Sequence, residues 1–125
     1  MQKSRARYRN KFEAAIGEVL KDYCDYESLK VPYIIHKKYT PDFIGKNIKT
    51  KIEGLVEAKG YFRVNDTQKY KAIRDSLPKE QVLVFLLYNP DKKVRKGSKM
   101  TMAKWCDKEK IYWYTLESIQ DAFTQ

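Results

Sequence analysis

The chain contains little cysteine and only one histidine. Its two cysteines, Cys24 and Cys106, are too few and too far apart in sequence for a disulfide framework or a zinc site. We therefore expect both to be reduced thiols. The single histidine, His36, is more typical of a polar residue at a strand end than of a general base, although a contact with DNA is possible.

Long hydrophobic runs are also absent. No apolar stretch approaches the ~20 residues that a membrane-spanning helix needs. Residues 1–9 lack the apolar core of a signal peptide. We therefore expect an intracellular protein with no membrane partner.

Acidic residues are fewer than basic residues in this chain. Twenty-six Lys and Arg stand against sixteen Asp and Glu, so the formal net charge is +10. Such a surplus is typical of a surface that binds phosphates, and it favours nucleic acid as the partner. The length of 125 residues, with 42% hydrophobic and 34% charged residues, predicts one globular domain spanning residues 1–125.

Hydrophobic periodicity predicts helices and strands that interleave along this domain. Apolar stripes predict helices over residues 12–23, 66–77 and 116–123, and a shorter one after a cap at Ser98 or Thr101. Predicted strands cover residues 29–35, 39–44, 48–59, 81–88 and 111–114. The economical architecture is one mixed α/β sheet flanked by helices.

Prolines, glycines and capping residues refine the predicted strands and the second helix. Pro32 makes residues 29–35 either an edge strand or an irregular connector. Gly54 predicts a bulge or bend in its strand, and Gly45 opens a predicted turn. Asp66 or Thr67 is the expected cap of the second helix.

Two carboxylates and an amine are the candidate site. Glu57 and Lys59 lie two residues apart on one strand, so both side chains project from the same face. If the strand that carries Asp42 pairs alongside, the carboxylates of Asp42 and Glu57 come close and repel each other. A divalent cation between them would remove that conflict.

Magnesium suits such a site because it prefers oxygen ligands and keeps several waters. The backbone carbonyl of Ala58 is a possible third ligand, and Lys59 could orient the attacking water or stabilise charge on a phosphate. The alternative is structural: an exposed ion pair between Glu57 and Lys59, beside an Asp42 that caps a turn. On helical periodicity alone, Glu13 is either a solvated acid in a first turn or a carboxylate half buried against a neighbour.

Four ordered segments carry a resemblance to a known family. They are Val-Pro-Tyr-Ile-Ile at 31–35, Tyr-Thr-Pro-Asp-Phe at 39–43, Val-Glu-Ala-Lys-Gly at 56–60, and Lys-Gly-Ser at 96–98 followed by Trp-Cys at 105–106. Asp42 followed by Glu-Ala-Lys at 57–59 resembles the active-site motif of the nucleases that have the restriction-endonuclease-like fold. The whole set resembles the phage endonuclease I family, whose members resolve Holliday junctions.

The resemblance implies a magnesium-dependent endonuclease that cuts four-way and other branched DNA by paired incisions, with Mn²⁺ as an expected substitute. It implies catalytic roles for Glu13, Asp42, Glu57 and Lys59, with Asp42, Glu57 and Ala58 at the metal. It further implies a segment-exchanged homodimer, bridged by about residues 29–38, in which Glu13 reaches the partner's site. The stretch 36–38 is shorter than in the best-known family member, and this could change the angle between the two halves.

Basic residues outside the site are candidate DNA contacts. They lie in an N-terminal arm (residues 1–11), in the bridge and in a loop before the third helix: Arg5, Arg7, Arg9, Lys37, Lys38, Lys92, Lys93, Arg95, Lys96 and Lys99. Two alternatives stay open, a duplex DNA nuclease of the same fold and a non-catalytic basic DNA-binding protein. If a phage encodes the chain, we expect it to act in the host cytoplasm.

Overall fold

The computed structural model describes residues 8–125. The chain divides into two compact units, Met1–Lys37 and Lys38–Gln125, which are described separately here. The single nuclease domain expected for residues 1–125 stays a prediction. Among the described residues, no helix has both the length and the apolar character needed to cross a membrane.

The first unit contains the predicted helix, α1 (Lys11–Leu20). It begins where Asn10 accepts a hydrogen bond from the Glu13 N–H at 2.8 Å, while the Glu13 carboxylate accepts from the Arg9 N–H at 2.8 Å. The bond to Asn10 satisfies a donor that a helix start leaves open, and the bond from Arg9 holds the residue before the cap. The helix ends at Leu20, earlier than predicted, and buries none of its residues.

The segment after α1 corrects one prediction. Residues 28–41 have no regular secondary structure, so the strand expected at 29–35 is wrong for the single chain. A strand needs a hydrogen-bonded partner, and Pro32 also lacks an N–H to donate to one. The alternative prediction from Pro32, that residues 29–35 form an irregular connector, is confirmed.

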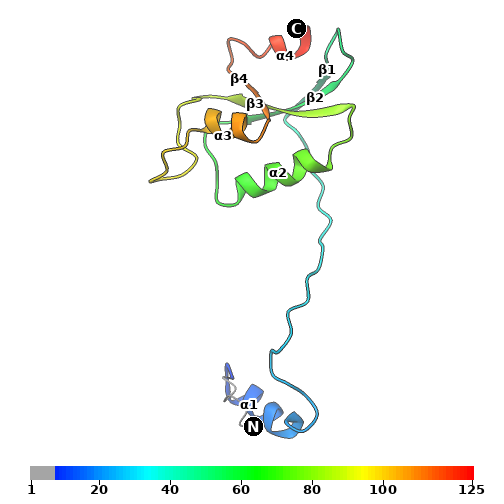
Figure 1. Cartoon of the computed structure of the whole chain (residues 1–125), viewed down its shortest axis with the longest axis vertical. Helices are drawn as coiled ribbons and strands as arrows, with labels where there is room; N and C mark the ends of the chain where they lie inside the picture. The colour runs from blue at the N-terminus through cyan, green and yellow to red at the C-terminus, as the bar shows by residue number, and fades with distance from the viewer. Residues whose placement is uncertain (1–7) are drawn as a thin grey trace. The chain divides into compact units, whose positions relative to one another are not determined.

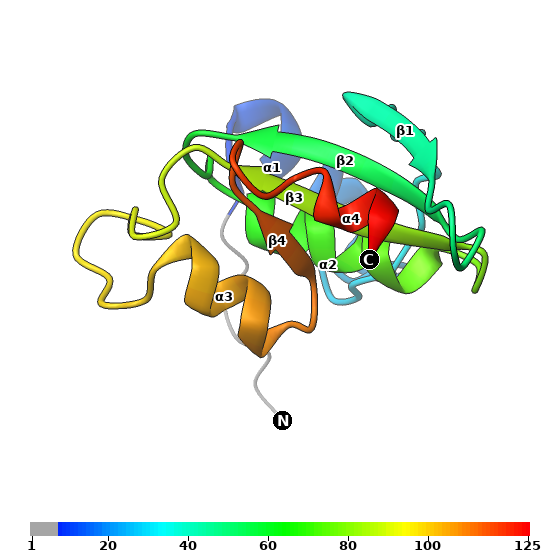
Figure 2. The same ribbon diagram turned by 90° about the horizontal axis from the view of Figure 1, so that it is seen from above.

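The second unit is built on a mixed sheet of four strands in the order β1 (Phe43–Lys46), β2 (Glu53–Lys59), β3 (Gln81–Leu87) and β4 (Tyr112–Tyr114). The β1–β2 pair is antiparallel and the other two pairs are parallel. The helices α2 (Asp66–Ser76) and α3 (Met102–Lys108) cover one face, and the short α4 (Asp121–Thr124) lies over the other (Figures 1 and 2). This confirms the predicted α/β sheet flanked by helices.

The core lies between the sheet and the helices α2 and α3. Leu83, Phe85 and Leu87 alternate along β3 and pack with Tyr70 of α2 and Trp105 of α3 in one buried cluster. β3 has a strand on each side, and most of its residues from Leu83 to Leu87 are buried, as predicted for a central strand. This packing fixes α2 against the face from which Glu57 and Lys59 project.

Other boundaries differ from the predictions. The first hairpin strand starts at Phe43 rather than at residue 39, and its turn follows Asn47, whose side chain accepts from the N–H groups of residues 49 and 50. Gly54 is not bulged but pairs in register with Gly45. A Cβ atom at either glycine would lie 3.2–3.4 Å from the Phe123 ring, so the glycines make room for α4.

The remaining helix predictions hold in part. α2 ends just before Pro78, as expected, but Asp66 is its first residue rather than its cap, and Asn65 precedes it in the left-handed region (φ 73°). Thr101 caps α3 by accepting from the Lys104 N–H at 3.1 Å, which confirms that prediction. The helix expected over 116–123 is reduced to the four residues of α4.

Candidate active site

Asp42 and Glu57 meet at the point where the β1–β2 ladder ends. Residues 43 and 56 are partners, so the same register continued by one residue sets Asp42 opposite Glu57. The Asp42 carboxylate accepts a hydrogen bond from the Ala58 N–H at 2.9 Å. The side chain of Asp42 thus takes the place of the next backbone partner and is anchored beside Glu57.

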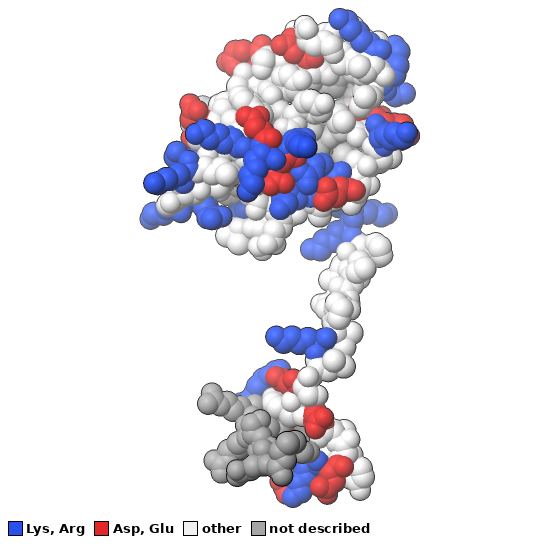
Figure 3. Space-filling view, in the orientation of Figure 1, with Lys and Arg blue, Asp and Glu red and all other residues white. Residues whose placement is uncertain are grey.

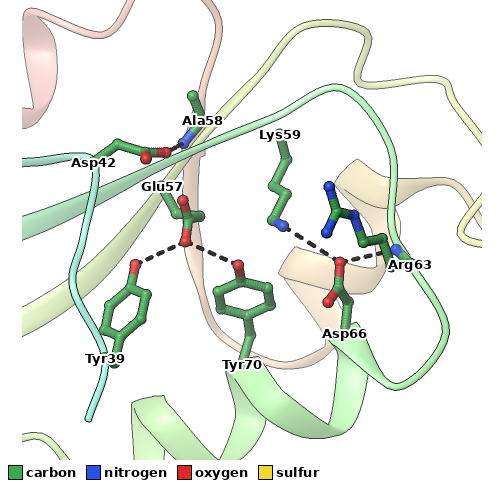
Figure 4. Close-up of polar contacts among 8 residues, drawn as sticks. All are labelled: Tyr39, Asp42, Glu57, Ala58, Lys59, Arg63, Asp66 and Tyr70. Carbon is green, nitrogen blue, oxygen red and sulfur yellow. Dashed lines mark hydrogen bonds and ion pairs between the residues drawn. The ribbon is translucent and has the colours of Figure 1, made fainter.

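Glu57 is a buried carboxyl, 8% exposed. One of its oxygens, Oε1, accepts hydrogen bonds from the Tyr70 hydroxyl at 2.8 Å and from the Tyr39 hydroxyl at 3.1 Å. The other oxygen faces Asp42 (Figure 4). Glu57 therefore has one oxygen held by phenols and one directed to the neighbouring carboxylate.

The proton affinities of the two carboxyls are pushed apart. Burial raises the pKa of Glu57, and the Asp42 carboxyl beside it raises that pKa further, against the lowering effect of the two tyrosine hydroxyls. The pKa of Asp42 is lowered by its hydrogen bond with Glu57 and by the Ala58 N–H. Of the two carboxyls, Glu57 is therefore the one that keeps its proton to the higher pH.

The tyrosines keep their protons. Burial, followed by the charge of Glu57 for Tyr39 and by the hydrogen bond to Glu57 for Tyr70, raises the pKa of each above the ordinary value of a phenol. Each hydroxyl is therefore available as a donor at neutral pH. Their hydrogen bonds stabilise the ionised form of Glu57, the form that a metal requires.

The backbone around Ala58 adds a third oxygen. Its N–H points toward Asp42, whereas the next carbonyl along the strand, that of Lys59, accepts from the Tyr88 N–H on the β3 side. Since strand groups alternate in direction, the Ala58 carbonyl points to the β1 side. Its partner in the continued register would be Pro41, which has no N–H to donate. The proline before Asp42 thus leaves this carbonyl without a donor from the β1 side within the described part of the chain.

These donors fit a magnesium ion. Two carboxylates and a carbonyl are hard oxygen ligands, and they leave positions for the waters that Mg²⁺ retains. Among residues 8–125 no group of three or more His, Cys, Asp or Glu side chains is arranged to hold a metal. The donor set within one chain is therefore small and would need water, substrate or a further carboxylate to complete it.

Lys59 lies on the same face as Glu57 and is also held in place. Its ammonium is 3.3 Å from the Asp66 Oδ2 and 4.8 Å from the centre of the Tyr70 ring. Asp66 accepts in addition from the Arg63 N–H at 2.8 Å, which fixes it at the start of α2. An amine, two carboxylates and a free carbonyl thus gather at the ends of β1 and β2 (Figure 4).

Glu13 belongs to the first unit, and the position of that unit relative to the second is not determined. It is partly buried and accepts from the Arg9 N–H and from the Tyr26 hydroxyl at 2.9 Å. These two hydrogen bonds lower the pKa of Glu13. It is thus held against a neighbour as well as lying in a first turn, and its catalytic role stays a prediction.

The predicted DNA contacts are basic and mostly exposed. Arg5 and Arg7 lie outside the described residues, and Arg9 forms an ion pair with Glu27. The loop between β3 and α3 is anchored by the buried Val94 and leaves its basic side chains in solvent (Figure 3). Exposed candidates are Lys37, Lys38, Lys92, Lys93, Arg95, Lys96 and Lys99.

Sequence reasoning missed three residues of this site. No sequence pattern singles out Tyr39 or Tyr70 for the site, and Asp66 is predicted only as an alternative cap of the second helix. Helical periodicity does direct Tyr70 toward the sheet. No sequence pattern, however, indicates which strand residue meets its hydroxyl.

One comparison with known proteins gives a match. The family model for phage endonuclease I matches residues 1–117 of the 125-residue chain. No curated protein matches the chain. The matched range contains Asp42, Glu57, Ala58 and Lys59 as well as Glu13.

Proposed function

Because this chain belongs to the phage endonuclease I family and is therefore an endonuclease acting on DNA, we propose that it resolves four-way junctions and other branched DNA by magnesium-dependent hydrolysis. The observation that carries this proposal is the pairing of Asp42 with the buried Glu57, beside a free carbonyl and Lys59. Membership of the family also favours an enzyme over the non-catalytic alternative. We place the activity in the cytoplasm of the host cell.

Asp42, Glu57 and the Ala58 carbonyl are the residues that would hold the metal. A bound Mg²⁺ would supply an activated water and neutralise charge on the scissile phosphate. Glu57 would hold the metal as a carboxylate, with any proton released to solvent, and the hydroxyls of Tyr39 and Tyr70 would keep its Oε1 hydrogen-bonded. Mn²⁺ has the same preference for carboxylate and carbonyl oxygens and should replace Mg²⁺.

Lys59 serves the phosphate or the attacking water. Its side chain is 16% exposed, so the ammonium lies near the surface but is restrained by Asp66. In hydrolysis the water oxygen bonds to phosphorus while one backbone P–O bond breaks. An amine at this place stabilises the negative charge that develops on the phosphate oxygens.

Two copies of the chain are needed for paired incisions, and we propose a segment-exchanged homodimer of restriction-endonuclease-like fold. α1 buries no residue, and its Phe12 and Val19 side chains are exposed. The connector carries a second series of exposed apolar side chains: Leu29, Val31, Tyr33, Ile34 and Ile35. Apolar surface of this extent is typical of an interface. In the exchanged dimer, α1 would bring Glu13 to the partner's Asp42 and Glu57.

The DNA is expected to be held through its phosphates. The net charge of +10 and the exposed lysines of the β3–α3 loop favour contacts that position the backbone without reading bases. Together with the arm and the bridge, this gives Arg5, Arg7, Arg9, Lys37, Lys38, Lys92, Lys93, Arg95, Lys96 and Lys99 as the proposed contacts. Selectivity for branched DNA would then come from the shape of the dimer.

The test is cleavage of a labelled four-way junction with Mg²⁺ or with EDTA, beside its duplex arms alone. We expect cuts in two strands of the junction with Mg²⁺ and none with EDTA. Glu57→Gln should abolish cutting because the amide cannot bind the metal as a carboxylate does, while junction affinity stays within about threefold because phosphate contacts dominate it. Magnesium-dependent cutting by that variant would contradict the site. Equal affinity for junction and duplex would instead indicate the duplex nuclease.

A further inference from the structure

One buried side chain contacts two residues of the proposed site. Tyr70 on α2 is 1% exposed, and its hydroxyl donates to the Glu57 Oε1 at 2.8 Å. The face of its ring lies 4.8 Å from the Lys59 ammonium. Glu57 and Lys59 are two residues apart on β2, and Tyr70 reaches both from the helix that covers them (Figure 4).

The ring of Tyr70 is itself fixed by other aromatic residues. It packs edge-on against Phe85 with ring centres 5.0 Å apart at 89°, and against Tyr39 at 6.2 Å and 87°. Such edge-to-face contacts favour one ring orientation. The hydroxyl and the ring face of Tyr70 are therefore held by β3 and by the segment before β1.

The hydroxyl restricts how Glu57 can turn. Among residues 8–125 only Tyr39 and Tyr70 donate hydrogen bonds to the Glu57 side chain, and both donate to Oε1. A carboxylate held at one oxygen keeps its other oxygen in one direction, here toward Asp42 (Figure 4). The phenols thus set which oxygen of Glu57 is presented to a metal shared with Asp42.

The ring restricts Lys59 in a different way. The negative face of a tyrosine ring attracts an ammonium within about 6 Å. Asp66 holds the same ammonium by a 3.3 Å ion pair, so the ring and the carboxylate define its position together. The Lys69 ammonium also lies over this ring, 5.3 Å from its centre.

We propose that Tyr70 is a positioning residue that aligns the two parts of the site at once, the metal-binding Glu57 through its hydroxyl and Lys59 through its ring. This inference rests on the proposed function. Tyr39 shares only the first of these roles, because its hydroxyl reaches Glu57 whereas no cation lies over its ring among the described residues. The two tyrosines therefore form a matched pair for a test.

The hydroxyl is tested by metal binding in the absence of DNA. Mn²⁺ is titrated into wild type, Tyr70→Phe and Tyr39→Phe, and free Mn²⁺ is measured by electron paramagnetic resonance. Loss of an outer hydrogen bond to a metal ligand costs about 10-fold or more in affinity, so we expect each variant to bind Mn²⁺ about 10-fold more weakly. Wild-type affinity in Tyr70→Phe would overturn the role of the hydroxyl.

The ring is tested by nuclear magnetic resonance of Lys59 in the metal-free protein. Ring current should shift its side-chain signals upfield in wild type and Tyr70→Phe, and the shift should vanish in Tyr70→Leu. With saturating metal, Tyr70→Leu should cut a junction about 10-fold more slowly than Tyr70→Phe, and the matched change from Tyr39→Phe to Tyr39→Leu should cost less. An equal cost at the two positions would overturn the role of the ring.

Two controls keep these outcomes distinct. If Tyr70→Leu does not fold, two measurements still test the proposal: the chemical shifts of Lys59 in wild type and the Mn²⁺ affinity of Tyr70→Phe. Lys59 side-chain signals without an upfield shift in wild type would overturn the proposal. If wild type neither binds Mn²⁺ nor cuts DNA, the proposed function fails. If wild type does both and the Tyr70 variants match it, only the inference about Tyr70 fails.

Discussion

At the scale of single residues, the site places an acid where ionisation is unfavourable. Glu57 is buried and lies beside Asp42, and both conditions raise its pKa. The segment before β1 and the helix α2 offset this with one phenol donor each, Tyr39 and Tyr70, rather than with a cation on Glu57 itself, since Lys59 pairs with Asp66. The arrangement is thus better suited to a bound metal than to the metal-free protein.

This yields a prediction for stability against pH. The folded-state pKa of Glu57 is raised, so the folded protein holds a proton that the unfolded chain releases as pH rises through the ordinary carboxyl range. Ionisation above that range therefore destabilises the metal-free fold. Gln imitates protonated Glu57, accepting from Tyr70 and donating to Asp42. In EDTA at pH 7–8, Glu57→Gln should have a higher Tm than wild type.

The same comparison has a built-in control. Below the ordinary pKa of a carboxyl the difference in Tm should disappear, because wild-type Glu57 is then protonated in the folded and unfolded states alike. Saturating Mg²⁺ should raise the Tm of wild type and leave that of Glu57→Gln unchanged. A lower Tm for Glu57→Gln at pH 7–8 in EDTA would contradict the assignment of a raised pKa.

At the scale of elements, the two glycines of the β1–β2 hairpin let α4 cover the sheet. A Cβ atom at Gly54 would lie 3.4 Å from the Phe123 ring and 3.6 Å from Val84. Valine adds two further methyl groups for which this space has no room. We expect Gly54→Val to lower the free energy of unfolding by about 1–3 kcal/mol in urea denaturation.

Gly60 is the matched control for that substitution. It directly follows β2, and no atom lies within 4 Å of a Cβ built there. Gly60→Val should change the free energy of unfolding by no more than about 0.5 kcal/mol. Equal losses at the two positions would contradict an effect of Gly54→Val through the contact with Phe123.

The sequence predicted elements where local signals were strong. The apolar run of β3 and the proline after α2 placed those elements correctly, and strand alternation put Glu57 and Lys59 on one face. It failed where tertiary contacts decide. The bulge predicted at Gly54 is wrong because this glycine makes room for the ring of Phe123, which lies near the other end of the chain. The roles of Tyr70 and Asp66 depend on how α2 packs against β2, and that of Tyr39 on how the segment before β1 lies beside Glu57. No local pattern contains that information.

At the scale of the whole molecule, each active site of the proposed dimer would contain residues from two chains. Glu13 lies in one unit, and the other candidate residues lie in the second. An exchanged dimer would join the Glu13 of one chain to the Asp42 and Glu57 of its partner. Twofold symmetry would then give two equivalent sites with a fixed separation, which suits two incisions in one junction.

Mixed dimers test this exchange. Chains carrying Glu13→Ala are combined with chains carrying Asp42→Ala, and heterodimers are purified through different tags. If Glu13 acts in the partner's site, each heterodimer has one intact site and should nick a junction at about half the wild-type rate. If Glu13 acts within its own chain, both sites are damaged, and the absence of nicking would contradict the exchange.

The most direct test of the central claim is a crystal structure of the protein with bound Mn²⁺, located by its anomalous scattering. We predict a peak within about 2.0–2.3 Å of carboxylate oxygens of Asp42 and Glu57 and of the Ala58 carbonyl oxygen, as oxygen ligands of such a cation require. The Tyr70 hydroxyl should still hydrogen-bond to the Glu57 oxygen that faces it. A protein that cuts DNA with Mn²⁺ but shows its only peak away from Asp42 and Glu57 would contradict the account.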